Sequence, residues 1–118
     1  MEIPKINVKA VHELQENSDT LILLDVREES EFYSESAPNS KNFPLSNLNV
    51  EAIAETLGID KDKTTPLYFI CRSGSRSEAA AKKFYFRGYE QVYNVEGGMI
   101  KWQEFGLPIR KSDQGSNS

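Results

Sequence analysis

Long apolar runs and cysteines are both scarce in this sequence of 118 residues. The longest apolar runs lie near residues 21–24 and 67–71, and neither approaches the roughly 18 apolar residues of a membrane-spanning helix. The single cysteine can form no disulfide bond within the chain and cannot supply a cluster of thiolate metal ligands. The first residues lack the basic segment and following apolar segment of a signal peptide. We therefore expect a cytoplasmic protein with no membrane partner.

The composition is that of a folded protein with one hydrophobic core. Hydrophobic residues make up 38% of the chain, and the 27% of charged residues mixes both signs, which excludes a disordered or collagen-like chain. The length is typical of one domain. We expect a single domain over residues 1–110, followed by a flexible polar tail over residues 111–118.

Charge is distributed unevenly along the chain. Residues 1–71 carry 6 basic and 13 acidic side chains, whereas residues 72–118 carry 8 basic and 5 acidic ones. The basic residues concentrate between positions 72 and 87, where one acidic residue, Glu78, accompanies Arg72, Arg76, Lys82, Lys83 and Arg87. A short basic segment on an acidic chain favours a small anionic ligand over nucleic acid, which normally requires an extended basic face.

Helices and strands are predicted to alternate along the chain. Apolar spacing and end signals predict helices over residues 8–15, 28–33, 50–57, 75–87 and 99–105. Short apolar runs predict strands over residues 21–26, 42–44, 67–70 and 92–95. Asn7 is expected to cap the first helix, Gly58 to end the third, and Ser75 to Glu78 to form a capping box. This alternation predicts an α/β fold with a mostly parallel sheet and helices on both faces.

Cys71 is predicted to lie at the carboxyl end of a buried strand, directly before a loop and a helix. Ligands of open α/β sheets bind at this edge, and backbone N–H groups at a helix start favour an anion there. Gly74 permits the tight loop, while Arg72 and Arg76 add two guanidinium groups suited to an oxyanion. Because these groups stabilise a thiolate, we expect the pKa of Cys71 to lie below the free-thiol value of about 8.5.

Four blocks of sequence resemble the rhodanese (sulfurtransferase) family. The loop from Cys71 to Ser77 is similar to the family's active-site loop, in the form associated with thiosulfate rather than mercaptopyruvate. The other blocks, in order, are residues 24–27 with Glu31 and Phe32, residues 42–45, and residues 88–98 with Trp102, Leu107 and Pro108. The resemblance extends from about residue 6 to residue 109 and implies a five-stranded, mostly parallel sheet.

The resemblance implies a reaction that passes through a persulfide on Cys71. This residue would attack the outer sulfur of a donor such as thiosulfate, and cyanide or a thiol would then remove that sulfur. The implied substrate-binding residues are those of the loop: Arg72, Ser73, Gly74, Ser75, Arg76 and Ser77. The two arginines would orient the sulfonate, and backbone N–H groups would hold the persulfide. The resemblance implies no metal and no cofactor.

The expected partners are a small anionic sulfur donor, a thiol or cyanide acceptor, and a sulfur-accepting protein. The oligomeric state stays open, with a monomer favoured. Residues 35–40 depart from the family pattern, because the family's usual histidine and both glycines are absent and only Pro38 is kept. Since this segment helps to form the wall of the family's active site, the identity of the donor is an open question.

Two alternative functions are weighed against sulfur transfer. Related phosphatases and arsenate reductases have five residues between the cysteine and the arginine, whereas four separate Cys71 from Arg76 here. The tighter loop suits a single sulfur atom better than a phosphate group. The second alternative is a regulatory binding module or a persulfide carrier that gives its sulfur only to a partner protein.

Five further residues are expected to have structural roles. His12, the only histidine, is predicted to lie on the surface of the first helix rather than to pair with Cys71. Asp25 and Arg27 are expected to support the fold. Trp102 and Met99 are expected to pack in the core, with one of them a candidate for the rim of the pocket.

Overall fold

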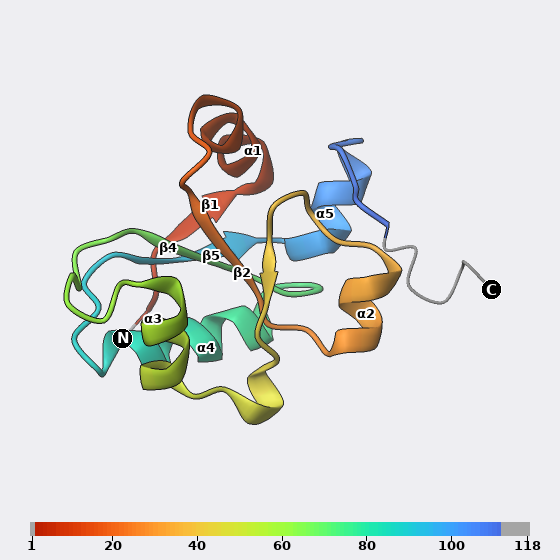
Figure 1. The fold of residues 1–118 in the computed structure, drawn as a ribbon. Coiled ribbons are helices and arrows are strands. Elements are labelled where there is room, and N and C mark those ends of the chain that lie inside the picture. Colours follow the sequence, from red (N-terminus) through yellow and green to blue (C-terminus); the bar gives the residue numbers. More distant parts are fainter. Residues whose placement is uncertain (1, 112–118) are drawn as a thin grey trace.

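The computed structural model describes residues 2–111 and contains a five-stranded parallel sheet (Figure 1). The strands are β1 (Lys5–Asn7), β2 (Ile22–Asp25), β3 (Lys41–Asn42), β4 (Leu67–Ile70) and β5 (Val92–Glu96). Their order across the sheet is β1-β5-β4-β2-β3, and every neighbouring pair is parallel. The predicted α/β fold is therefore confirmed, with β4 at the centre.

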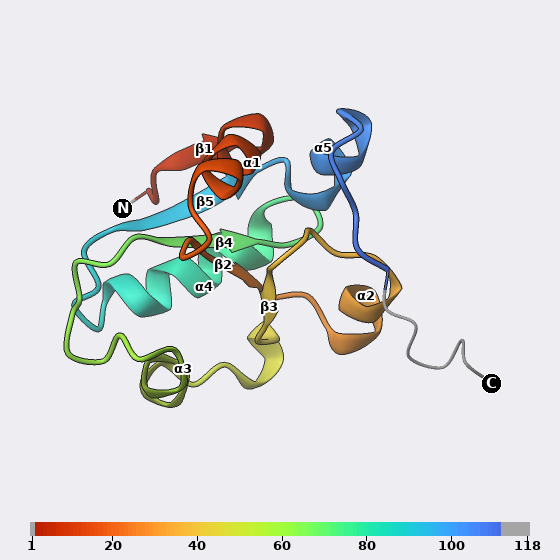
Figure 2. The same cartoon turned by 45° about the horizontal axis from the view of Figure 1, so that its top comes forward.

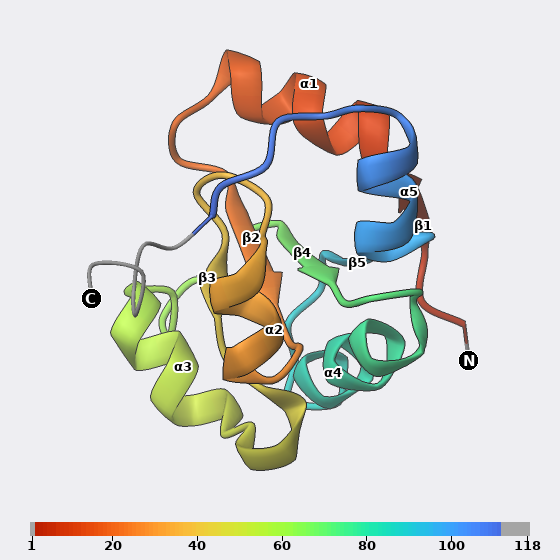
Figure 3. The ribbon, with the colours of Figure 1, turned by 90° about the vertical axis from the view of Figure 1, so that its right-hand side faces the viewer.

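Helices cover both faces of the sheet, as Figures 1 and 3 show. The helices are α1 (Val8–Asn17), α2 (Glu29–Ser34), α3 (Val50–Leu57), α4 (Ser75–Tyr85) and α5 (Gly98–Glu104), with a 3-10 turn, η1, at Leu45–Asn47. Helices α1 and α5 lie on one face, and α3 and α4 lie on the other. Because α2 directly follows β2, it lies beyond the carboxyl end of that strand.

The core consists of two layers, one on each side of the sheet. Successive strand residues point to opposite faces, so Leu24 and Phe69 pack with α3 and α4, whereas Leu23 and Ile70 pack with α1 and α5. Both layers are apolar, which explains why β2 and β4 appear in the sequence as continuous apolar runs.

Two of the expected helix ends are confirmed, and one is wrong. The Asn7 side chain accepts a hydrogen bond from the backbone N–H of Ala10 at the start of α1, and Gly58 ends α3 with a left-handed φ of 75°. The capping box predicted for Ser75 to Glu78 is absent, because α4 is preceded by Gly74, which has no side chain. A capping box forms instead at α2, between Glu28 and Glu31.

Strand β1 is not among the strands that apolar runs predict from the sequence. Its three residues have no apolar run, and two of them are exposed. The strand exists because it pairs with β5, an interaction of the backbone that side-chain patterns do not reveal.

The tail predicted over residues 111–118 lies outside the described residues except for Lys111. Among residues 2–111, no helix combines the length and the apolar character needed to cross a membrane.

Candidate active site

Cys71 lies directly after β4, at the carboxyl edge of the parallel sheet. In Figure 2, the loop that follows it joins the end of β4 to the start of α4. Only 1% of the residue is exposed. The location at the strand end and before a helix is the one predicted from the sequence.

The first turn of α5 packs directly on the backbone of this loop. The N–H groups of Met99 and Ile100 donate hydrogen bonds to the carbonyl oxygens of Cys71 and Arg72, with N···O distances of 2.9 and 3.1 Å. A Cβ atom on Gly98 would lie 2.3 Å from the Cys71 carbonyl oxygen, so this close approach requires glycine. Helix α5 therefore fixes the start of the loop.

Two groups of the loop and of α4 contact the sulfur of Cys71. The N–H of Gly74 donates to Sγ at 3.0 Å, and the hydroxyl oxygen of Ser77 lies 3.3 Å from it. Burial raises the pKa of the Cys71 thiol, but hydrogen bonds to the thiolate form from the Ser77 hydroxyl and from the N–H groups of Ser77, Gly74 and Ser73 lower it to below its ordinary value. The lowered pKa predicted from the sequence is confirmed, and hydrogen bonds rather than the arginines are its main cause.

Arg76 has a carboxylate partner that its sequence neighbours do not predict. Two of its guanidinium nitrogens donate to the carboxylate oxygens of Glu31 in α2, at 2.7 and 3.0 Å. The hydrogen bonds from Arg76 are the largest cause that lowers the pKa of Glu31 to about 2. The same pair raises the pKa of Arg76, and the nearby Cys71 raises it further. The fork of this arginine is thus occupied within the protein.

Arg72 is exposed and has no ion-pair partner among residues 2–111. It lines a pocket of about 250 Å³ between α2 and α5. The other lining residues are Arg27, Glu31, Ser34, Glu35, Met99, Ile100 and Gln103. Glu35 belongs to the segment that departs from the family pattern, so this segment contributes to the wall of a pocket beside the loop. Ser73 and Ser75 are also exposed.

Asp25 and Arg27 form a buried ion pair at the end of β2. The guanidinium donates to both carboxylate oxygens, at distances between 2.8 and 3.1 Å, and also to the backbone carbonyl of Glu35 at 2.6 Å. Asp25 has no exposed surface, which agrees with the structural role expected for it. The pair holds the start of α2 and the segment after it against the sheet.

The aromatic and sulfur-containing side chains of α5 are buried. Trp102 is fully buried and Met99 is 3% exposed, as expected for core residues, and Met99 also lines the pocket beside Arg72. His12 is less exposed than predicted, because its ring packs edge-on against Trp102 with 6.0 Å between the ring centroids. Its side chain is 24% exposed, and its Nε2 lies 3.8 Å from a carboxylate oxygen of Glu16.

Two residues of the site were not identified from the sequence. Glu31 was noted only as part of a matching block, and its contact with Arg76 joins positions 45 residues apart. Asn94 of β5 is 3% exposed, and its side chain contacts Ser77 next to Cys71. A polar residue in the middle of a buried strand was the available signal for Asn94.

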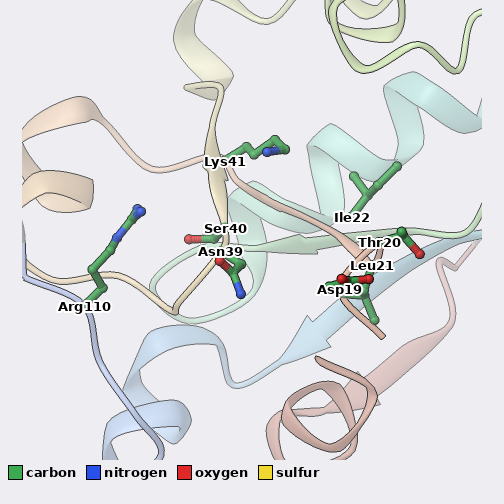
Figure 4. A pocket seen from close by; sticks show the side chains of 8 residues that line it. All are labelled: Asp19, Thr20, Leu21, Ile22, Asn39, Ser40, Lys41 and Arg110. Atoms are coloured by element: carbon green, nitrogen blue, oxygen red, sulfur yellow. The ribbon is translucent and has the colours of Figure 1, made fainter. Parts of the chain in front are cut away.

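A second pocket, of about 350 Å³, lies at the opposite edge of the sheet (Figure 4). It is lined by residues before and at the starts of β2 and β3, together with Arg110. Figure 4 shows Lys41 and Arg110 well apart. The Arg110 guanidinium also stacks on Phe32, 5.1 Å from the ring centroid.

Within residues 2–111, no three histidine, cysteine, aspartate or glutamate side chains cluster as metal ligands would.

Comparison with known proteins identifies relatives along nearly the whole domain. The profile of the rhodanese-like domain family matches residues 7–105. YtwF of Bacillus subtilis, named provisionally as a sulfurtransferase, is 39% identical over 103 residues, which are 87% of this chain and 93% of YtwF. YrkF of the same bacterium, named provisionally as a sulfur carrier protein, is 35% identical over 85% of this chain and 51% of YrkF. A further relative, the uncharacterized protein slr1261 of Synechocystis, is 36% identical over 88% of this chain. The chain spans about half the length of slr1261 and of YrkF, 54% of the first and 51% of the second.

A solved structure agrees with these sequence relatives. The crystal structure of a thiosulfate sulfurtransferase from Pseudomonas aeruginosa superposes with a TM-score of 0.77 and 25% identity, over 93% of this chain and 20% of that one. The family profile, the near full-length match to YtwF and the shared fold lead to one conclusion. This chain belongs to the rhodanese-like domain family, and its relatives include sulfurtransferases and sulfur carriers.

Proposed function

We propose that this chain transfers a sulfane sulfur through a persulfide on Cys71, with thiosulfate as a donor. The observation that carries the proposal is the environment of Sγ, which accepts the N–H of Gly74 while loop hydrogen bonds lower the pKa of the thiol. A thiolate at the carboxyl edge of a parallel sheet is a nucleophile placed where ligands of such sheets bind.

The proposed reaction has two displacement steps. In the first, the Cys71 thiolate attacks the outer sulfur of thiosulfate, the sulfur–sulfur bond breaks, and sulfite leaves with the bonding electron pair. The chain then carries a persulfide with one negative charge. In the second step, cyanide or a thiolate attacks the terminal sulfur and restores the Cys71 thiolate. Backbone N–H groups of the loop would stabilise the negative charge of the persulfide.

The two arginines are proposed to have different roles in this reaction. Arg72 is exposed beside the pocket, so its guanidinium is available to bind the sulfonate group of the donor. Arg76 is bonded to Glu31 through both carboxylate oxygens, so it holds the loop against α2 and contributes its charge from there. This differs from the equal roles that the family resemblance implied.

A persulfide carrier is the second candidate function, and one observation favours it. YrkF, a relative over 85% of this chain, is named provisionally as a sulfur carrier. A carrier would load sulfur once and release it only to a protein acceptor. The four-residue spacing between Cys71 and Arg76 continues to favour either sulfur function over phosphate hydrolysis.

Steady-state thiocyanate formation distinguishes the enzyme from the carrier. With thiosulfate and cyanide in excess, we expect many equivalents of thiocyanate per chain, and none from Cys71→Ser. A chain that binds one sulfur atom from thiosulfate but forms no thiocyanate would support the carrier. No thiocyanate from the folded, reduced protein, with no sulfur bound, would reject thiosulfate as the donor.

A further inference from the structure

Asn94 lies in β5 and its side chain reaches the first turn of α4. The amide group makes three hydrogen bonds there, to the Gly74 carbonyl oxygen, to the Glu78 carboxylate and to the Ser77 hydroxyl. Gly74 and Ser77 are also the two residues whose groups contact the sulfur of Cys71. Asn94 therefore connects the sheet to both groups that surround Sγ.

The orientation of the Asn94 amide is fixed by its partners. The amide nitrogen lies 3.0 Å from the Gly74 carbonyl oxygen and 3.3 Å from Oε1 of Glu78. Both of these oxygens only accept hydrogen bonds, so the NH₂ group must face them. The amide oxygen is consequently directed at the Ser77 hydroxyl, where it acts only as an acceptor.

Ser77 has one hydroxyl proton and three acceptors within reach. The distances from its oxygen are 2.5 Å to Oδ1 of Asn94, 3.2 Å to the Gly74 carbonyl and 3.3 Å to Sγ of Cys71. Oδ1 of Asn94 is the nearest, and it has no other donor among these groups. The hydroxyl proton therefore points to Asn94, and the Ser77 oxygen accepts the S–H of a resting Cys71 thiol.

We propose that Asn94 is a positioning residue that sets the direction of the Ser77 hydroxyl and thereby controls how readily Cys71 becomes a thiolate. When the thiol loses its proton, Sγ has only acceptor sites, so the Ser77 hydroxyl must turn to donate to it. That turn leaves Oδ1 of Asn94 buried without its donor, which costs free energy. Asn94 thus favours the resting thiol and limits the stabilisation of the thiolate by the loop.

The other charged groups that the neighbouring elements place around Cys71 are unchanged in the variants compared below. Helix α4 contributes Arg76, whose charge is coupled to the sulfur, and Glu78 behind Asn94. The carboxyl end of β2 contributes the Asp25–Arg27 pair. Arg72 follows Cys71 directly, Glu31 of α2 binds Arg76, and α5 contacts the Cys71 backbone through the uncharged Met99.

The test is the pH dependence of Cys71 alkylation by iodoacetamide in two Asn94 variants. Asn94→Leu removes the competing acceptor and keeps four side-chain heavy atoms branched at Cγ, so the midpoint of alkylation should fall by about one pH unit. Asn94→Asp keeps an acceptor and adds negative charge near Sγ, so its midpoint should rise. A role in stability alone predicts shifts of the same direction or no shift, and either result would overturn the proposal.

A Ser77→Ala background shows whether Asn94 acts through Ser77. In that background, Asn94→Leu should no longer lower the pH midpoint of Cys71 alkylation. A decrease as large as the one in the native background would overturn the proposal. If Asn94→Leu does not fold, Asn94→Asp provides the test. The increase that it causes in the alkylation midpoint must become smaller in the Ser77→Ala background. Asn49→Ala, which removes the cap of α3, serves as a control that lowers stability without moving the midpoint.

This inference concerns the roles of residues around the proposed nucleophile, but its test measures the thiol itself. Alkylation requires no sulfur donor. A chain that shows the opposite shifts in the two variants but never binds sulfur would refute the proposed function and leave the role of Asn94 intact.

Discussion

Arg72 and Arg76 flank the Cys71 loop, and their surroundings differ at the residue scale. Arg76 bonds both oxygens of Glu31, whereas Arg72 is exposed at a pocket. A planar guanidinium can bond a carboxylate through two parallel hydrogen bonds, and an ammonium group cannot reproduce that geometry. The loop after Cys71 is therefore tied to α2 through a contact that depends on arginine.

Replacement of Arg76 by lysine should reduce sulfur transfer although the charge is kept. We expect kcat/KM for thiosulfate to fall about tenfold, since one charge-assisted hydrogen bond is lost. Glu31→Gln should lower it in the same direction, because Arg76 loses the same partner. Unchanged thiosulfate kinetics in Arg76→Lys would show that this contact does not matter for the reaction.

The ion pair between Glu31 and Arg76 should also make stability depend on pH. The pKa of Glu31 is lowered from 4.5 to about 2 in the folded protein. Because the folded value is the lower one, the pair stabilises the fold above pH 4.5, and this contribution is lost as the pH falls toward 2. Thermal unfolding between these pH values should therefore show a smaller fall in Tm for Glu31→Gln than for the native chain. Equal falls would contradict the assignment.

At the scale of elements, the packing of α5 on the loop carries the clearest structural constraint. Gly98 has a φ of 54°, and a Cβ atom there would meet the backbone of Cys71 and Arg72 at 2.3 to 2.7 Å. Gly58 has a similar φ of 75° but no atom within 4 Å of such a Cβ. A substitution at Gly58 therefore adds backbone strain alone, whereas a substitution at Gly98 adds both backbone strain and a steric clash.

Gly98→Ala should be more harmful than Gly58→Ala. The control should cost about 1 kcal/mol in the free energy of unfolding, from the left-handed backbone alone. Gly98→Ala should cost clearly more and should also abolish most sulfur transfer, because α5 must move away from the loop. Urea unfolding and thiosulfate turnover measure the two effects. Equal losses in both variants would contradict the close packing.

Elements with apolar periodicity or end signals were predictable, and elements held by distant contacts were not. Helix α1 follows from Asn7, and β4 follows from its apolar run. Strand β1 has neither signal, because its partner β5 is distant in the sequence. The first turn of α4 was misassigned because Gly74, with a φ of 121°, rather than a serine precedes it.

The residues of the candidate site likewise include some that the sequence predicts and some that only the fold brings together. Cys71, Arg72 and Arg76 were predictable because they are contiguous and lie at a strand end before a helix. Glu31 and Asn94 reach the site through contacts across 45 and 17 residues of sequence, which only the folded chain brings together. The partner of Arg76, and hence the different surroundings of the two arginines, was therefore beyond sequence patterns.

At the scale of the whole molecule, basic charge is concentrated on a chain whose net charge is −4. Arg72 lies at the pocket beside the loop, whereas Lys83 lies exposed on α4 and borders a different pocket, against α3. An anionic donor should therefore depend on Arg72 and be nearly indifferent to Lys83. The overall acidity of the chain makes the local arrangement, not the net charge, responsible for attraction of the donor.

Arg72→Ala and Lys83→Ala form a matched pair for this prediction. The first should raise KM for thiosulfate about tenfold with a smaller effect on kcat, since a charge-assisted contact to the donor is lost. The second should leave both constants nearly unchanged. Steady-state kinetics at fixed ionic strength measure the difference. Equal changes in KM would mean that general charge, and not the pocket, attracts the donor.

The central claim, that Cys71 carries the transferred sulfur, is tested most directly by the intact mass of the protein. After incubation with thiosulfate and desalting, the native chain should gain one sulfur atom, about 32 Da, and Cys71→Ser should gain nothing. Cyanide should then return the native chain to its original mass. An unchanged mass of the folded, reduced chain with thiosulfate and with other persulfide donors would contradict the account.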